Sequence, residues 1–221
     1  MPDPAHYDPP RFIAIEGPMR VGKSSLTRLL AERVGAACLS DTEDNPFIDR
    51  FYEGLPGSGF AAQLYFLMER FKQWRALDFA STAHRLVISD YLFEKDKIYA
   101  YLNLNDAELR LYEQYYGMLA DQVPIPDLVI YLQAKAETLR VRIGLKNVAS
   151  EHEVSDEYLE ELVRAYDHFF HYYKSSDLLV VETSEMDFVH RNRDLEELLQ
   201  RLRQPVRGTQ YFLPLGSADA D

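Results

Sequence analysis

Residues 17–24 read Gly-Pro-Met-Arg-Val-Gly-Lys-Ser, with the spacing G-x-x-x-x-G-K-[ST] of a phosphate-binding P-loop. Each residue type suits a separate task. Gly17 and Gly22 let the backbone turn tightly, so that its N–H groups point inward at an anion. Lys23 places a positive charge on the outer phosphates, and the hydroxyl of Ser24 is a ligand for Mg²⁺. The stretch therefore predicts that a phosphate chain binds here.

The residues on either side agree with that interpretation. Residues 12–15 form an apolar, β-rich run, and apolar side chains recur at helical spacing over residues 25–34. A strand, a glycine-rich loop and a helix are the context that the motif requires, because the N-terminus of the helix then lies behind the phosphates. The residues expected to hold the phosphates are Gly17, Pro18, Met19, Arg20, Val21, Gly22, Lys23, Ser24 and Ser25.

Composition limits the class of protein. A chain of 221 residues with 47% hydrophobic residues can form one domain with a full core, at most with a small lid. Its formal net charge of −12 excludes a general nucleic-acid or anionic-membrane surface, because phosphate backbones demand a basic face. The single cysteine, Cys38, excludes an intramolecular disulfide, and its apolar neighbours predict that it is buried. No apolar run resembles a signal peptide or a membrane span, so we expect a cytoplasmic protein.

Strand-like and helix-like segments alternate between residues 11 and 204, and we expect disordered tails over residues 1–10 and 205–221. The expected strands are residues 12–16, 36–40, 86–89, 128–132 and 178–182. The expected helices are residues 23–34, 46–52, 60–81, 93–102, 106–122, 136–144, 155–173 and 194–202. Short apolar strands that alternate with helices predict an α/β fold with a parallel sheet covered on both faces. In such a sheet the ligand lies beyond the carboxyl ends of the strands.

Carboxylates follow the second and third expected strands. Asp41 or Glu43 could accept the proton of a hydroxyl that attacks a γ-phosphate, although both could equally belong to a solvated acidic loop. Asp90 closes the third strand, where an acid can hold Mg²⁺ through water or bind a substrate hydroxyl, but it could also cap the next helix. Asp96 lies six residues further on.

Gln63 and Arg70 are seven residues apart on an expected helix, so two turns place them on one face. An amide and a guanidinium that face the same way could read the edge of a nucleobase, or they could belong to a polar outer face. The aromatic side chains of Phe47 and Tyr52 suit an apolar nucleobase slot at the same rim, although such spacing is also typical of a core.

Cations follow the fourth expected strand. Arg142 and Lys146, in a segment that also contains Arg140 and Glu151, could fold over a nucleotide and meet the charge of the transferring phosphoryl group. The plain alternative is a charged helix surface.

Taken together, several stretches resemble one family. They are FIAIEGPMRVGKS from residue 12, DNPFIDRFY from 44, QLYFLMERFKQ from 63, VISDYLFEKDKIYA from 87, PDLVIYLQA from 126 and EYLEELVRAYDHFF from 157. Over roughly residues 11–190 the chain resembles the bacterial deoxynucleoside kinases, on the deoxyadenosine/deoxyguanosine kinase side. The resemblance implies a P-loop kinase fold with a five-stranded parallel sheet in the order 2-3-1-4-5 and a short lid over about residues 142–154. It also implies a homodimer.

The resemblance implies roles for several residues. The base-reading glutamine and arginine of the family fall on Gln63 and Arg70, and a second base-reading acid falls on Asp96. The acid after strand three falls on Asp90. The charged positions of the lid fall on Lys146 and Glu151.

The chain also departs from the family pattern. The family commonly has a catalytic Glu after strand two, where this chain has Asp41 and Glu43; we favour Asp41 because it lies closer to the strand end. The family often has an arginine after the strand-three acid, where this chain has Tyr91. The lid of the family usually carries an Arg-x-Arg pair, where this chain has only Lys146 at the first place and Val148 at the second. Substitutes for the missing arginine after strand three could be Arg20, Lys95 or Lys97.

The resulting hypothesis is nucleotide salvage: transfer of the γ-phosphoryl group from ATP, or another nucleoside triphosphate, to the 5′-hydroxyl of a deoxynucleoside, with a purine favoured. The donor is held by Lys23, the loop amides, Arg142, Lys146 and Mg²⁺, the last bound by Ser24 with Asp90 or Asp41 through water. The acceptor is walled by Phe47, Tyr52 and Phe66. Two alternatives remain: a thymidylate or other nucleoside monophosphate kinase, and a nucleotide-binding regulatory module without a small-molecule acceptor.

Overall fold

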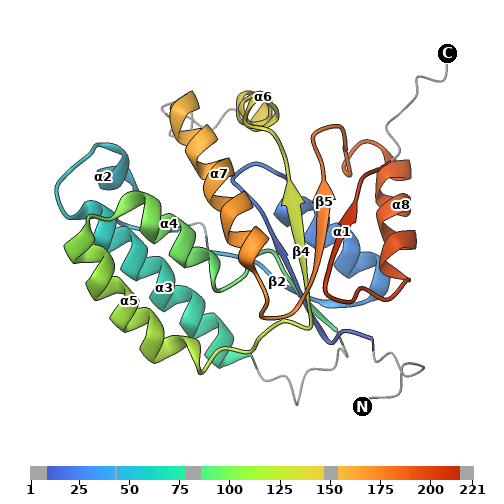
Figure 1. The fold of residues 1–221 in the computed structure, drawn as a ribbon, viewed down its shortest axis with the longest axis horizontal. Coiled ribbons are helices and arrows are strands. Elements are labelled where there is room, and N and C mark those ends of the chain that lie inside the picture. The colour runs from blue at the N-terminus through green and yellow to red at the C-terminus, as the bar shows by residue number, and fades with distance from the viewer. Residues whose placement is uncertain (1–8, 43, 78–85, 147–153, 215–221) are drawn as a thin grey trace.

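The computed structural model describes residues 9–42, 44–77, 86–146 and 154–214. Within these ranges six parallel strands form one sheet in the order β2-β3-β1-β4-β5-β6 (Figure 1). The strands are β1 (Phe12–Glu16), β2 (Ala37–Leu39), β3 (Val87–Ser89), β4 (Leu128–Gln133), β5 (Asp177–Glu182) and β6 (Thr209–Phe212). The first five lie where the sequence predicts them and in the expected order.

The sixth strand is a correction, because residues 205–221 were expected to be a disordered tail. Thr209–Phe212 instead pairs in parallel with β5 at the edge of the sheet. Gly208, with a φ of 63°, turns the chain into the strand, and its amide donates to Asp177 Oδ1 at 2.7 Å. The strand is half-exposed along its length, and Tyr211 is exposed. It therefore lacks the buried apolar run that identifies β1, β3, β4 and β5.

The described residues contain all eight expected helices, with small shifts of their ends. They are α1 (Lys23–Val34), α2 (Ile48–Tyr52), α3 (Ser58–Ala76), α4 (Lys95–Asn103), α5 (Asp106–Ala120), α6 (Ala136–Lys146), α7 (Asp156–Tyr172) and α8 (Asn192–Leu202). Asn105 forms a capping box at the start of α5, and the side chain of Ser155 accepts from the amide of Tyr158 at the start of α7. Residues 78–81, expected to continue α3, lie outside the described ranges.

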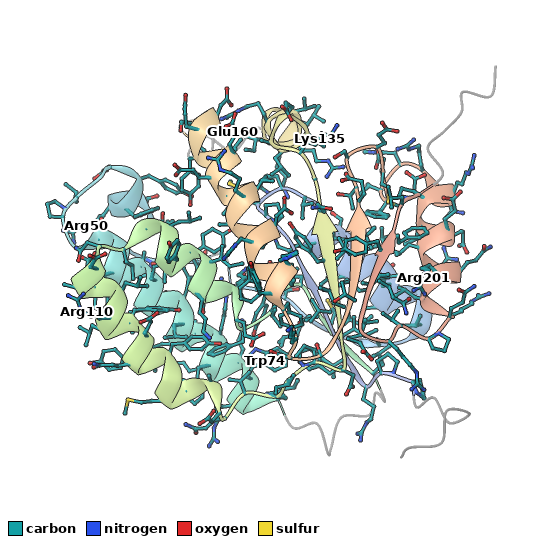
Figure 2. All side chains as sticks on the ribbon, in the orientation of Figure 1. Arg50, Trp74, Arg110, Lys135, Glu160 and Arg201 are labelled. Carbon is teal, nitrogen blue, oxygen red and sulfur yellow. The ribbon has the colours of Figure 1, made fainter. Side chains whose placement is uncertain are left out.

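The two faces of the sheet carry different cores. Alternate residues of β1 point to opposite faces: Phe12 and Ala14 pack toward α3, α4, α5 and α7, whereas Ile13 and Ile15 pack toward α1 and α8. Figure 1 shows α1 and α8 behind and beside the sheet and the other group on its opposite side. Trp74 of α3 lies against Phe12 with ring centroids 4.7 Å apart (Figure 2).

The structure bears on two further expectations, the burial of Cys38 and the lack of a membrane-spanning helix. Cys38 is exposed rather than buried, because β2 is the edge strand of the sheet and is only partly covered. Among the helices that the structure describes, none has the length and apolar character needed to cross a membrane.

Candidate active site

The P-loop connects β1 to α1, as its flanking pattern predicts. A Cβ atom at Gly17 would lie 2.5 Å from the carbonyl oxygen of Leu132, so only glycine fits this close approach to β4. Gly22, with a φ of 111°, occupies the N-cap of α1. Because glycine offers no capping side chain, the first amides of the helix are left for an external acceptor.

Lys23 folds back over the loop that precedes it. Its ammonium donates to the carbonyl oxygens of Gly17 at 2.7 Å and Pro18 at 3.0 Å. Burial lowers the pKa of Lys23 to about 8, although the nearby carboxylate of Glu16 opposes this shift. A half-buried cation beside an anion-binding loop is the arrangement that binds phosphate.

A cavity of about 630 Å³ opens beside the loop. It is lined by residues 20–25, by Thr138, Val141, Arg142, Leu145 and Lys146 of α6, and by residues 184–191 after β5. The cavity therefore brings together the two expected donor-binding segments. The contribution of residues 184–191 was missed, because this segment carries no motif and follows a strand in the same way as several other polar loops.

The two predicted cations of α6 differ in what they do. Arg142 donates to the carbonyl oxygens of Val21 at 2.9 Å, Thr183 at 2.7 Å and Met186 at 3.0 Å. Its guanidinium thus joins the P-loop to the segment after β5 instead of presenting a free charge to a phosphate. Lys146 is exposed at the end of α6, and Glu151 lies outside the described residues.

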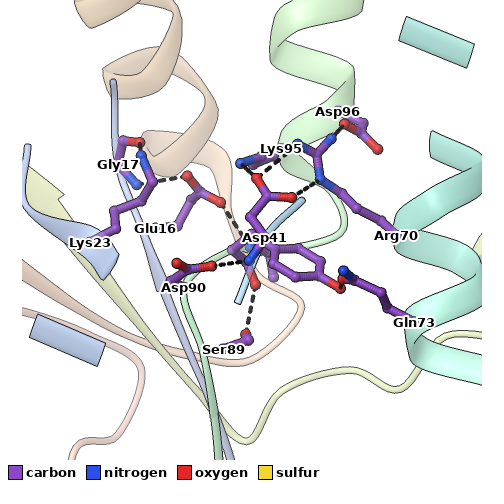
Figure 3. Close-up of polar contacts among 12 residues, drawn as sticks. Glu16, Gly17, Lys23, Asp41, Arg70, Gln73, Ser89, Asp90, Lys95 and Asp96 are labelled. Carbon is purple, nitrogen blue, oxygen red and sulfur yellow. Dashed lines mark hydrogen bonds and ion pairs between the residues drawn. The ribbon is translucent and has the colours of Figure 1, made fainter. Parts of the chain in front are cut away.

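A second group of charges lies next to the P-loop, at the carboxyl ends of β2 and β3 (Figure 3). Asp41 accepts from Arg70 twice, at 2.8 Å from Nε and 2.9 Å from Nη2, and from Lys95 Nζ at 2.5 Å. Its own amide donates to Asp90 Oδ1 at 2.5 Å. Burial would raise the pKa of Asp41, but the charges of Lys95 and Arg70 outweigh burial and hold it well below its usual range.

Asp96 occupies the far side of the same guanidinium. One carboxylate oxygen contacts Arg70 Nη1, whereas the other, Oδ2, is buried without a hydrogen-bond partner in the described part of the chain. Burial raises the pKa of Asp96 to about 6, against the opposing charge of Arg70. A buried acceptor without a partner beside this charged group suits a ligand N–H group.

The other predicted acceptor residues have different surroundings. Gln63 is buried on α3, and Arg70 Cζ lies 4.9 Å from the centroid of the Phe66 ring. The segment that contains Phe47 is docked on α3, because Asn45 Nδ2 donates to the Ala62 carbonyl at 3.0 Å. Tyr52, at the end of α2, is 37% exposed, and Glu43 lies outside the described residues.

Tyr91 replaces the arginine expected after Asp90. Its ring is buried, and its hydroxyl donates to Gln73 Oε1 at 2.8 Å, so the position carries no cation. Of the considered substitutes, Lys95 pairs with Asp41, whereas the ammonium of Lys97 lies 4.4 Å from the centroid of the Tyr116 ring. Their spacing in the sequence did not predict which of these two lysines pairs with an acid at the site.

Glu16 is a second residue that the sequence analysis missed, because it reads as the last residue of an apolar strand. It is fully buried between the P-loop and the segment after β3 (Figure 3). Its carboxylate accepts from the amides of Gly17 and Leu92, each at 2.8 Å, and from the hydroxyl of Tyr166 at 3.1 Å.

Comparisons with known proteins agree with this geometry. The sequence model of the deoxynucleoside kinase family matches residues 13–207. The chain is 31% identical to the deoxyguanosine kinase of Bacillus subtilis (strain 168), covering 88% of this chain and 97% of that protein. It is 25% identical to the deoxyadenosine/deoxycytidine kinase of the same organism, covering 93% and 97% respectively.

A solved structure has the same architecture. It is deoxyadenosine kinase from M. mycoides with the products dCMP and a flexible dCDP bound, which superposes with a TM-score of 0.72 and 25% sequence identity. The match covers 87% of this chain and 98% of that one. With its P-loop, its sheet order and the extent of these matches, the chain belongs to the deoxynucleoside kinase family.

Proposed function

We propose that this protein transfers the γ-phosphoryl group of ATP to the 5′-hydroxyl of a purine deoxynucleoside, in nucleotide salvage. The observation that carries the proposal is the juxtaposition of the P-loop with the buried group Asp41, Arg70, Lys95 and Asp96 at one edge of the sheet. The relatives support the choice of acceptor, because each of the three named above is called after a purine deoxynucleoside, one of them after deoxycytidine as well.

The donor end works by positioning and by charge. The ammonium of Lys23 exchanges the carbonyl oxygens of Gly17 and Pro18 for phosphate oxygens, and the first amides of α1 supply further donors. Arg142 keeps the P-loop and the segment after β5 at a fixed separation. Lys146, at the exposed end of α6, adds a positive charge over the donor.

The residues at the loop suit Mg²⁺. The described residues contain no cluster of three or more His, Cys, Asp or Glu side chains that could hold a metal unaided. This fits an ion that takes one or two protein oxygens and completes its shell with water and substrate phosphates. Ser24 would hold it directly, with Asp90 or Asp41 through water. When bound, the ion neutralises charge on the β- and γ-phosphates.

A second set of residues binds the base of the deoxynucleoside and its 5′-hydroxyl. Gln63, Arg70 and Asp96 orient the base, and the free Oδ2 of Asp96 accepts an N–H group from its edge. The sugar and base lie against Phe47, Tyr52 and Phe66. Asp41 is the preferred base for the 5′-hydroxyl, with Glu43 as the alternative. Lys95 keeps Asp41 ionised and takes the place of the arginine that Tyr91 replaces.

A panel of acceptors tests the proposal. Purified protein is incubated with ATP, Mg²⁺ and each of the four deoxynucleosides, and the products are identified by mass. We expect a monophosphate of deoxyadenosine or deoxyguanosine. Faster turnover of deoxyadenosine monophosphate than of deoxyadenosine would instead indicate a nucleoside monophosphate kinase. ATP turnover that no nucleoside increases would indicate the regulatory module.

We also propose that the protein is a homodimer that pairs through α3 and α5. Exposed apolar side chains gather on these adjacent helices: Met68 on α3 and Leu111, Tyr115 and Met118 on α5. Light scattering should give twice the mass of the chain, and Met118→Glu should shift it to the monomer. A monomeric wild-type protein at micromolar concentration would contradict the dimer.

The cytoplasmic location stays a prediction.

A further inference from the structure

Glu16 binds three segments that are distant in sequence. Its Oε1 accepts from the amide of Gly17, at the start of the P-loop, and from the hydroxyl of Tyr166 in α7. Its Oε2 accepts from the amide of Leu92, in the segment after β3. One side chain therefore joins the P-loop, the segment after β3 and α7.

These three donors are neutral, and the carboxylate is fully buried. Burying a charge is costly, so a carboxylate at this position needs all of its hydrogen bonds. It also has a property that no neutral side chain of the same size shares: two acceptor oxygens and no donor. A glutamine here would turn its NH₂ group toward a backbone N–H in either orientation.

The segments that Glu16 joins carry the two halves of the proposed reaction. On one side, the carbonyl oxygens of Gly17 and Pro18 hold Lys23. On the other side, Leu92 lies two residues after Asp90 and three residues before Lys95. The third partner is a separate contact: the ring of Tyr166 packs edge-on against that of Tyr99 of α4, with centroids 6.2 Å apart, whereas the link between Gly17 and Leu92 runs through the two backbone amides alone.

We propose that Glu16 is a positioning residue that couples binding of the triphosphate donor to binding of the deoxynucleoside. The inference rests on the proposed function. When Lys23 turns from the loop carbonyls to phosphate, the backbone at Gly17 adjusts. Glu16 transmits that adjustment through the Leu92 amide to the segment that carries Asp90, Lys95 and Asp96. The coupling is reciprocal, so each ligand changes the affinity of the other by the same factor.

Titration calorimetry measures this factor directly. The affinity for the preferred deoxynucleoside is determined with and without a saturating non-hydrolysable ATP analogue and Mg²⁺, for the wild type and for Glu16→Gln. We expect the analogue to tighten deoxynucleoside binding by roughly fivefold or more in the wild type. In Glu16→Gln the factor falls close to one while both ligands still bind. An unchanged factor in a folded Glu16→Gln protein overturns the inference.

Tyr166→Phe is the matched control, because it removes one donor from the same carboxylate and leaves both backbone contacts in place. The coupling factor should persist in this variant. Its loss would show that the path runs through α7 and would overturn the assignment to Gly17 and Leu92.

A measurement on the wild type avoids any failure of the variants to fold. Hydrogen exchange of the Leu92 amide is followed with the ATP analogue and Mg²⁺ but without a nucleoside. Exchange should slow, and an unchanged rate would contradict the coupling. Because this experiment contains no acceptor, it also separates the inference from the proposed function, which fails if no deoxynucleoside is bound or phosphorylated.

Discussion

The two faces of the sheet are covered by different kinds of side chain. The face toward α1 and α8 is filled mainly by aliphatic side chains, among them Leu26, Leu30, Ile130 and Leu198. The opposite face is rich in aromatic residues, with Tyr131 stacked on Phe170 at a centroid distance of 4.1 Å. The aliphatic face needs only good packing, whereas buried phenol hydroxyls also need polar partners.

The polar partners of these hydroxyls include residues close to the candidate active site. Tyr131 donates to Asp167 at 2.7 Å, Tyr91 to Gln73 and Tyr166 to Glu16. Arg70 of α3 pairs with Asp41 and with Asp96 of α4 (Figure 3), and both of these helices cover the same face. Hydrogen bonds fix directions as well as distances, so this face can orient a ligand. We therefore expect changes on the aliphatic face to alter stability and changes at the site edge to alter rate.

The largest expected effect is that of Lys23→Ala. Removing a cation aimed at the transferring phosphoryl group should lower kcat by roughly 10³-fold. The fold should remain intact, because in the described part of the chain the ammonium donates its hydrogen bonds to carbonyl oxygens of its own loop. Steady-state phosphorylation with a thermal melt of the same sample measures both quantities. A near wild-type rate would contradict the site.

Leu198→Ala tests the other face. Leu198 of α8 is fully buried in the aliphatic core, so its truncation should lower the free energy of unfolding by about 3 kcal/mol. Below the unfolding transition kcat should stay close to that of the wild type. Urea unfolding and the kinase assay are run on one preparation. A large fall in kcat with little loss of stability would mean that the two faces are not separate in function.

Asp41→Asn and Glu43→Gln, assayed side by side, identify the base. The variant that removes it should lose about 100-fold in kcat. The other should change the rate far less, although Asp41→Asn also weakens the pairing of Arg70 and Lys95. A pH–rate profile accompanies each assay. If neither variant is slow, the assignment after β2 is wrong.

The smallest expected effect concerns Asp96. Its pKa is raised to about 6, so between pH 4 and 6 the folded protein binds more protons than the unfolded chain. The contribution of Asp96 to the free energy of unfolding therefore falls as the pH rises through this range. Asp41, whose pKa is lowered, has the opposite sign: its contribution is lost as the pH falls below about 4.

Asp96→Asn isolates the first of these contributions. The difference in free energy of unfolding between the wild type and the variant should fall by on the order of 1 kcal/mol from pH 4 to pH 6. Urea unfolding at four pH values measures it. A constant difference would show that the pKa of Asp96 keeps its ordinary value, and a difference that rises with pH would show that it is lowered; either result contradicts the prediction.

Sequence alone predicted the parts of this molecule whose signal is local. The β1, P-loop and α1 unit follows from a motif with its flanks, and Asn105 and Ser155 mark helix starts through their own side chains. Arg70 and Asp96, both singled out by resemblance to the family, form an ion pair, and their base-reading roles stay a prediction.

The parts that were missed depend on contacts between distant segments. Strand β6 forms because β5 offers it an edge, although its own residues are half-exposed. Glu16 gains its importance from Leu92 and Tyr166, which no spacing in the sequence connects to it. Arg142 donates to the backbone carbonyl oxygens of three residues. Every residue type has such an oxygen, so the sequence does not show which residues will accept these hydrogen bonds.

The seat of Gly17 against β4 has a practical consequence for protein engineering. Since even one added methyl group would collide with the Leu132 carbonyl, the first position of the loop is closed to variation unless the central strands move apart. Attempts to retune donor preference should leave this position fixed. Residues 184–191 are better targets for a library, because they line the donor cavity from a loop outside the sheet.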